Sequence, residues 1–350
     1  MVRLRSGSVL RPWWANLQRD PRGVMTMVAK HNSLQLASLL LMFWCVAGCG
    51  GSSTTDTPAA AASTAGGAAV AATAPAETVA LTFGWPAGSK FQVEHEMSQS
   101  DGQQTEASKM TMDVAVEAVE GGLQVSVSNA VFTVPPGGGR ELPPGMLETM
   151  TALVPSYRVN AAGDFVEVVD AQARYDAAMA KLEMPEPLKK MLFGQYQPDA
   201  VAASAKREWD WIVARWKGRD LALGTPVEET SELELPNAPG TKQSTTITYT
   251  AQRVGCNPAD QATSCVAISG KSVLGGPELA RAMEAGTAKM GLKVTVNDAK
   301  IEQSFELIAH PGTLVPHKLV TTTAVEADQV IFGEAQKTST VATETRTYRY

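Results

Sequence analysis

The stretch Lys90-Phe-Gln-Val-Glu-His-Glu-Met97 indicates the class of fold, because Phe91, Val93 and His95 alternate with polar residues. Alternation with a period of two predicts a half-buried β-strand. The next apolar stretch, Met110–Val116, is followed by the turn Glu120-Gly-Gly122 and the stretch Leu123–Val127. Strands joined by glycine-rich turns form antiparallel hairpins. We therefore expect an antiparallel sheet to begin at residue 90.

The same alternation continues to the end of the chain, interrupted by stretches with helical periodicity. The further strands are expected at Tyr157–Asn160, Asp164–Val169, Val227–Leu235, Ser244–Val254, Cys265–Val273, Leu292–Ile308, Leu314–Val325 and Thr338–Tyr350. The helices are expected at Met146–Leu153, Ala171–Leu182 with Asp170 as N-cap, Pro187–Phe193, Asp199–Lys217 and Pro277–Met290. The sequence therefore predicts an α+β fold, an antiparallel β-rich domain with a helical insert at about 170–217.

The two halves of this body have their elements in a similar order. Each half, 79–169 and 224–350, runs through three strands, one helix and then a hairpin. We therefore consider two diverged β-rich repeats, separated by the helical insert. The alternative is that any antiparallel protein shows such an order by chance.

The overall charge hides two segments of opposite sign. The 350 residues carry 30 basic and 36 acidic residues, and 44% of them are hydrophobic, enough for a sizeable core. Residues 1–48 contain six basic residues and one acidic residue, so the remainder has a net charge of −11. An acidic body lacks the basic surface that nucleic-acid binding requires. We therefore expect no nucleic-acid partner.

A short apolar run precedes the second of the four cysteines. Leu39–Ala47 is too short to span a membrane as a helix but has the length of a signal-peptide core, with Lys30 before it. Val46-Ala47-Gly48-Cys49 follows, and these four residues resemble the lipobox of bacterial lipoproteins. The resemblance implies cleavage before Cys49 and acylation of Cys49, a membrane anchor that several acyl chains would make stable.

This resemblance divides the chain into three parts. Residues 1–48 are the expected signal peptide. Residues 1–24 look like an over-extended gene start, because translation from Met25 or Met27 would give a signal peptide of ordinary length. Residues 49–78 are the lipidated cysteine and a flexible tether rich in Ala, Gly, Ser and Thr. Residues 79–350 are the folded domain. Because Gly50 rather than Asp follows Cys49, the lipoprotein sorting rule points to the outer membrane, facing the periplasm.

The other two cysteines flank a short polar loop between two predicted strands. Exported proteins form disulfides, and the ends of paired strands bring two cysteines within bonding distance. We therefore expect a disulfide between Cys256 and Cys265 rather than a metal or redox site. His310 and His317 flank the turn Pro311-Gly312, where two histidines are more often solvated than metal-bound. The chain shows no motif for a catalytic residue, a metal or a cofactor, so we expect none.

The helical stretch 199–217 is rich in tryptophan. At 100° per residue, Trp209 and Trp216 share one apolar stripe, and Trp211 points away from it. This pattern predicts an amphipathic helix packed on the sheet, with Trp211 under a neighbouring loop. The alternative is that Trp209, Trp211 and Trp216 form a ligand-binding or membrane-contact surface, since tryptophan favours interfaces.

In layout, the body resembles β-rich bacterial envelope lipoproteins of unknown function, and this resemblance supplies no catalytic residues. We therefore expect a lipid-anchored protein of the cell envelope, not an enzyme, with a binding or structural role toward an envelope partner. The alternative is a carrier of lipid or another apolar ligand, held in a cavity between a curved sheet and the helices.

Overall fold

The computed structural model describes residues 77–133, 145–182, 185, 186, 189, 193–235, 241–257, 260–289, 293–331 and 333–350. The expected signal peptide, the lipobox with Cys49 and nearly all of the tether lie outside the described residues. So does most of the helix expected at Pro187–Phe193. The first described strand is β1, at Thr78–Ala80.

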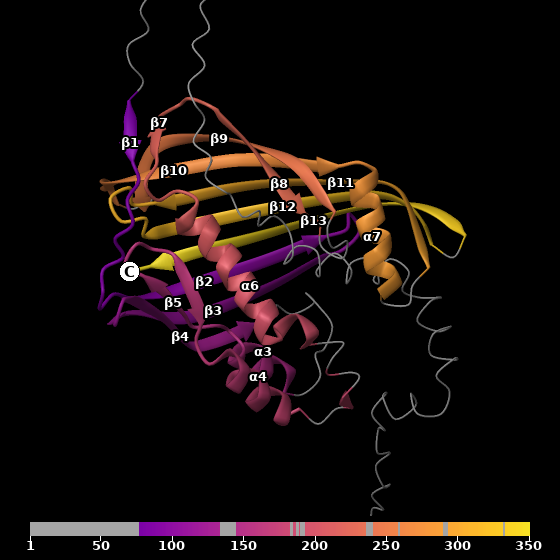
Figure 1. Ribbon diagram of the computed structural model, residues 1–350, viewed down its shortest axis with the longest axis horizontal. Helices are drawn as coiled ribbons and strands as arrows, with labels where there is room; N and C mark the ends of the chain where they lie inside the picture. Colours follow the sequence, from indigo (N-terminus) through magenta and orange to yellow (C-terminus); the bar gives the residue numbers. More distant parts are fainter. Residues whose placement is uncertain are drawn as a thin grey trace, which may run out of the picture.

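One antiparallel sheet of eleven strands dominates the described residues (Figure 1). Its order is β6-β5-β4-β3-β2-β13-β12-β11-β10-β9-β8, and β1 pairs separately with β7. The strands are β2 Lys90–Ser100, β3 Thr105–Val119, β4 Gly122–Thr133, β5 Tyr157–Asn160, β6 Phe165–Val168, β7 Asp220–Ala222, β8 Val227–Glu234, β9 Lys242–Asn257, β10 Asp260–Gly275, β11 Val294–Ala309, β12 Pro316–Ile331 and β13 Glu334–Arg349. The β-rich α+β class predicted from the alternation is confirmed.

Within the eleven-stranded sheet, neighbouring strands are consecutive in the chain everywhere except at one seam. There β13, the last strand, pairs with β2 in antiparallel register, with Arg346 opposite His95. The seam joins the strands from residues 90–168 and those from residues 227–349 into one continuous sheet. This continuity does not support two repeats. The strands that the repeats would equate differ in length, since β5 and β6 have four residues whereas β11 and β12 have sixteen.

The helices form close to their predicted positions. They are α3 Met146–Ala152, α4 Ala171–Ala180, the 3₁₀ turn η2 Gly194–Tyr196, α6 Pro198–Trp209, the π-helical turn η3 Asp210–Ala214 and α7 Pro277–Lys289. Asp170 lies at the expected N-cap position of α4, but its side chain does not cap the helix. That residue has a left-handed backbone with φ of 53°, and its side chain makes no capping hydrogen bond. An N-cap needs an extended backbone to aim its side chain at the helix.

Helices α6 and α7 cross the same face of the sheet (Figure 1). The residues of β10 show this, because side chains an even number of positions apart point the same way. Ile268 belongs to the core cluster under α6 and η3, and Leu274, six positions further, belongs to the cluster under α7. We call this the helix-covered face and the opposite side the open face. A third apolar cluster joins α3 and α4 around Leu153, Ala178 and Phe193.

Candidate binding face

Trp209 and Trp216 lie inside the core under α6 and η3. Their exposed fractions are 1% and 0%, and Ile212 and Val213 of the same stripe are also buried. The Trp209 ring packs edge-on against Trp85 at 5.1 Å and against Tyr157 at 5.6 Å, and its indole N–H donates to the Gly163 carbonyl at 2.9 Å. Amphipathic packing on the sheet is therefore what the structure shows. As residues of an exposed contact surface, Trp209 and Trp216 were wrongly assigned, because both rings are enclosed.

The 100° spacing predicts that Trp211 points away from that stripe, but its ring packs against the same apolar cluster. It is half-buried, its ring lies 4.9 Å from the ring of Phe305, and the Arg215 guanidinium stacks over it at 5.2 Å. Its backbone carbonyl accepts the Trp216 indole N–H at 2.7 Å. Trp211 therefore covers the middle of β11 instead of extending into solvent.

A charged network fastens the end of η3 to the strand at the edge of the sheet. Arg215 and Arg219 both pair with Glu229 of β8, and the Tyr249 hydroxyl donates to the same carboxylate at 2.8 Å. Burial raises the pKa of Glu229, but the bonds from Arg219 and Tyr249 outweigh burial, and its pKa lies below the ordinary value. No local pattern predicts this network, because Arg215 and Arg219 lie just after η3 and meet Glu229 only once β8 has joined the sheet.

A second charged group lies at the seam, on the helix-covered face. His95 and Arg346 are direct cross-strand partners, and the His95 Nε2 atom lies 3.4 Å from a carboxylate oxygen of Glu344. Arg346 pairs with Glu208 of α6, and its other terminal nitrogen lies 3.7 Å from Glu344. Burial raises the pKa of Glu344, but His95 and Arg346 outweigh it and lower the pKa to about 2. The group therefore ties α6 to the seam through charges.

Between the apolar clusters under α6–η3 and α7, the helix-covered face becomes polar. Ser272, Gln303 and Thr323 are aligned across β10, β11 and β12, and Thr321 and Glu344 are aligned one row away. We call these five residues the polar band. All but Ser272 are half-buried.

Two buried polar atoms in and beside the polar band have no hydrogen-bond partner among the described residues: Gln303 Oε1 and Thr245 Oγ1. The His95 Nε2 atom, one strand beyond, faces the Glu344 carboxylate at 3.4 Å. Buried polar atoms without a partner are rare in native proteins, because each costs about 1–3 kcal/mol. Their gathering on one strip of the sheet indicates a surface that still has hydrogen-bonding capacity to offer.

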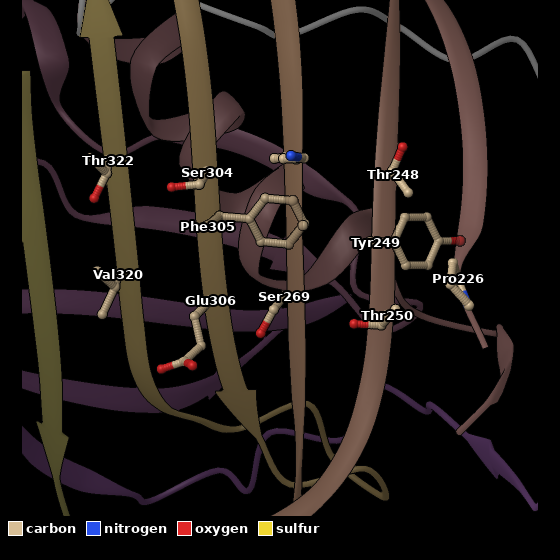
Figure 2. A pocket seen from close by; sticks show the side chains of 12 residues that line it. Pro226, Thr248, Tyr249, Thr250, Ser269, Ser304, Phe305, Glu306, Val320 and Thr322 are labelled. Atoms are coloured by element: carbon tan, nitrogen blue, oxygen red, sulfur yellow. The ribbon is translucent and has the colours of Figure 1, made fainter. Parts of the chain in front are cut away.

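A hollow of about 500 Å³ lies on the open face, across strands β9 to β12 (Figure 2). Its lining includes the outward side chains Thr248, Lys271, Ser304, Glu306 and Thr322. On the helix-covered face of the same strands, Gly270 has no side chain, and the Phe305 and Tyr249 side chains pack against its backbone there. The hollow is thus not the cavity that a carrier would hold between sheet and helices. Under α6–η3 the described side chains pack directly on the sheet.

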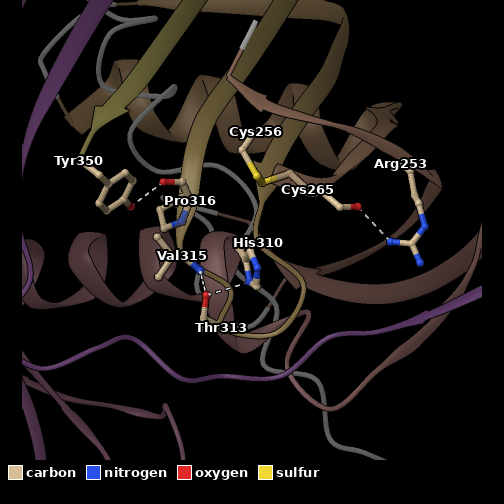
Figure 3. Close-up of a disulfide and its surroundings, with 9 residues drawn as sticks. Arg253, Cys256, Cys265, His310, Thr313, Val315, Pro316 and Tyr350 are labelled. Carbon is tan, nitrogen blue, oxygen red and sulfur yellow. Dashed lines mark hydrogen bonds between the residues drawn. A yellow bond between two sulfur atoms is a disulfide. The ribbon is translucent and has the colours of Figure 1, made fainter. Parts of the chain in front are cut away.

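The disulfide predicted between Cys256 and Cys265 is confirmed, with the two Cα atoms 4.9 Å apart (Figure 3). It bridges β9 and β10 beside the turn that carries His310 and His317. The His317 ring lies 5.2 Å from the Tyr350 ring in a tilted arrangement, and burial, together with nearby His310, lowers the pKa of His317. The His310 Nδ1 atom lies 3.4 Å from the Thr313 hydroxyl. The two histidines are thus neighbours, as the turn predicts.

Comparisons with known proteins assign no family to this chain. No family model matches the chain, and no curated protein matches it. Among solved structures, a chain titled "lipid-protein interactions in lipovitellin" is similar at 10% identity with a TM-score of 0.37. That match covers 76% of this chain and 26% of the lipovitellin chain, and so low a score carries no argument. In the described residues, no helix has both the length and the apolar character to cross a membrane.

Proposed function

We propose that this chain is a lipid-anchored protein of the cell envelope that acts by binding a partner and not by catalysis. The lipobox Val46-Ala47-Gly48-Cys49 and the nearly uncharged tether support the anchor, and Gly50 after Cys49 supports an outer-membrane location facing the periplasm. The folded domain would then be held away from the lipid surface by a tether of about 30 residues.

The observation that carries the binding role is the polar band with its unpartnered atoms. Gln303 Oε1 and Thr245 Oγ1 are buried, and neither has a partner in the described part of the chain. A partner that offers N–H or O–H groups to this strip would satisfy them. The titratable residue of the band, Glu344, is engaged with His95 and Arg346, and Arg346 also pairs with Glu208. These pairings favour binding over acid–base chemistry.

The alternative of an apolar carrier has less support. The space in which a lipid would lie under α6–η3 is filled by Trp209, Ile212, Val213 and Trp216. The hollow on the open face lies outside the space between the sheet and the helices, and its lining mixes Thr, Ser, Lys and Glu side chains with the apolar residues Pro226 and Val320. We therefore prefer a polar partner, a protein or another envelope component, at the polar band.

Site-specific photo-crosslinking in intact cells tests this proposal. A photoreactive residue at position 323 lies in the polar band, whereas one at position 322 lies on the open face, within the hollow. We expect a defined crosslinked product from position 323 and none from position 322. Equal products at both positions, a product from position 322 alone, or none from either would contradict the proposal. A lipid retained by the purified protein in native mass spectrometry would favour the carrier instead.

A further inference from the structure

The disulfide and a histidine form a compact group of atoms with metal-binding chemistry. Cys256 at the end of β9, Cys265 in β10 and His317 in β12 each contribute one such atom. The two sulfur atoms and the nearest imidazole nitrogen all lie within 4.8 Å of one another. Three strands of the sheet therefore bring together two sulfurs and one nitrogen that are distant in sequence (Figure 3 shows the disulfide).

Two thiolates and one imidazole are a common ligand set for zinc. Zinc binds cysteine sulfur at about 2.3 Å and histidine nitrogen at about 2.0–2.1 Å, so tetrahedral ligands stand about 3.5–3.8 Å apart. The three ligand atoms already lie within 4.8 Å of one another, so the two sulfurs, once released from each other, have only a short distance to move to reach that spacing. Three protein ligands leave the fourth position open for water. While the sulfurs are bonded to each other, however, neither is a thiolate, and the set is incomplete.

We propose that Cys256, Cys265 and His317 form a redox-controlled zinc site, closed while the disulfide is intact and open after its reduction. A dithiol reductant supplies the two electrons and two protons that break the sulfur–sulfur bond, and the dithiol itself becomes a disulfide. Zn²⁺ then displaces the two thiol protons into solvent and binds both thiolates and the neutral His317 imidazole. This inference does not depend on the binding role of the polar band.

The test compares zinc binding by the oxidised and the reduced full chain. The protein is reduced with excess dithiothreitol and freed of it by anaerobic gel filtration, its thiols are counted, and Zn²⁺ alone is titrated by calorimetry. The double variant Cys256→Ser/Cys265→Ser sets the baseline, because Cys45 and Cys49 also carry thiols in the full chain. We expect the reduced wild type to bind one more zinc ion than this baseline, and the oxidised protein to bind none beyond it.

Two histidine variants identify the third ligand. Loss of a residue that supports a metal ligand already weakens binding about 10–100-fold, so His317→Ala should weaken it by at least about tenfold. His310→Ala is the matched control from the same turn and should bind as the wild type does. The proposal is overturned if the oxidised and reduced proteins bind alike, if both histidine variants weaken equally, or if the disulfide is reducible only with loss of the fold.

Discussion

At the scale of single residues, Gly270 determines how the rings above it pack. A Cβ atom placed there would lie 2.7 Å from the Phe305 ring and 2.8 Å from the Cβ atom of Tyr249. A glycine inside a strand gives up side-chain packing, and neighbouring aromatic rings can fill the space it leaves. The Phe305 ring in turn packs against the Trp211 ring, so the space above Gly270 supports the contact between η3 and the sheet.

Gly270→Ala should destabilise the domain by about 1–3 kcal/mol, the usual cost of overpacking a core, because neither ring can move without disturbing η3. The free energy of unfolding in urea measures the effect. Ser269→Ala, one residue away and pointing to the open face, is the control and should change it by no more than about 0.5 kcal/mol. An unchanged stability in Gly270→Ala would show that the rings relax freely.

The lowered pKa of Glu344 predicts how the free energy of unfolding depends on pH. Folding lowers its pKa from 4.5 to about 2, so its ionised form stabilises the fold above pH 4.5, and that contribution is lost as the pH falls toward 2. The charged groups that face it are His95, Arg346 and, through Arg346, Glu208.

Accordingly, the wild type should be more stable than Glu344→Gln at pH 7, and the difference should shrink between about pH 4.5 and 2. Urea unfolding of both proteins over this pH range measures it. Glu334→Gln removes an exposed charge from the same strand and is the control. A difference that stays constant with pH would show that Glu344 is not held ionised by its neighbours.

At the scale of elements, the helix–turn α6–η3 is fastened to the sheet by three kinds of contact. Trp209 and Trp216 fill the core, Glu208 pairs with Arg346 of the seam, and Arg215 pairs with Glu229 of β8. The π-helical turn η3 shifts the residues after Trp209 relative to a regular α-helix. Turns of this kind are rare and are often found at functional sites.

Substituting the two tryptophans separates packing from surface contact. Trp209→Ala should cost about 3–5 kcal/mol, as for other buried aromatic residues. Trp211→Ala should cost only about 1–2 kcal/mol, the sum of one aromatic pair and one cation–π contact. Thermal and urea unfolding measure both variants. If Trp211→Ala leaves stability intact but weakens binding to lipid or a partner, the contact-surface interpretation of Trp211 is the correct one.

The disulfide links β9 and β10 at the end of their hairpin. Closing a loop of this length is expected to stabilise the protein by about 2–3 kcal/mol, chiefly by restricting the unfolded chain. Cys256→Ser/Cys265→Ser should lower the free energy of unfolding by that amount. A reducing agent should lower the stability of the wild type similarly and leave the double variant unchanged. An effect of the reducing agent on the double variant would place the redox sensitivity elsewhere.

At the scale of the whole molecule, the seam between β13 and β2 makes one sheet out of two groups of strands. Each group alone would expose a long unpaired strand in the middle of the sheet, and such edges invite aggregation. The seam also brings His95 and Arg346 together across 250 residues of sequence, and α6 covers them. The charged group and the polar band therefore exist only in the complete fold.

The proposed lipid anchor predicts that the protein fractionates with the membrane. Cys49→Ser should abolish the incorporation of labelled palmitate and release the mature domain from the membrane fraction, because the acyl chains supply the attachment. Cell fractionation and metabolic labelling check this, and Cys45→Ser, four residues earlier, is the matched control. Membrane attachment that persists in Cys49→Ser would contradict the lipobox interpretation.

The strands, the helix positions and the disulfide follow from the sequence, because each depends on neighbours within about fifteen residues. Period-two alternation marks the strands, and the short loop between Cys256 and Cys265 lets the cysteines meet once their strands pair. The stripe of Trp209 and Trp216 is likewise a local property of one helix. The apparent repetition of strand order was misleading, because a simple meander produces the same order without duplication.

Only the tertiary structure decided which distant residues meet. The pairing of β13 with β2, the contact of Glu208 with Arg346, the polar band and the approach of His317 to the disulfide all join segments far apart in the chain. Local patterns carry no information on such pairings, since a strand with one apolar face satisfies its alternation beside any suitable neighbour. The order of strands is selected by the packing of the whole sheet against its helices, and the candidate sites are consequences of that order.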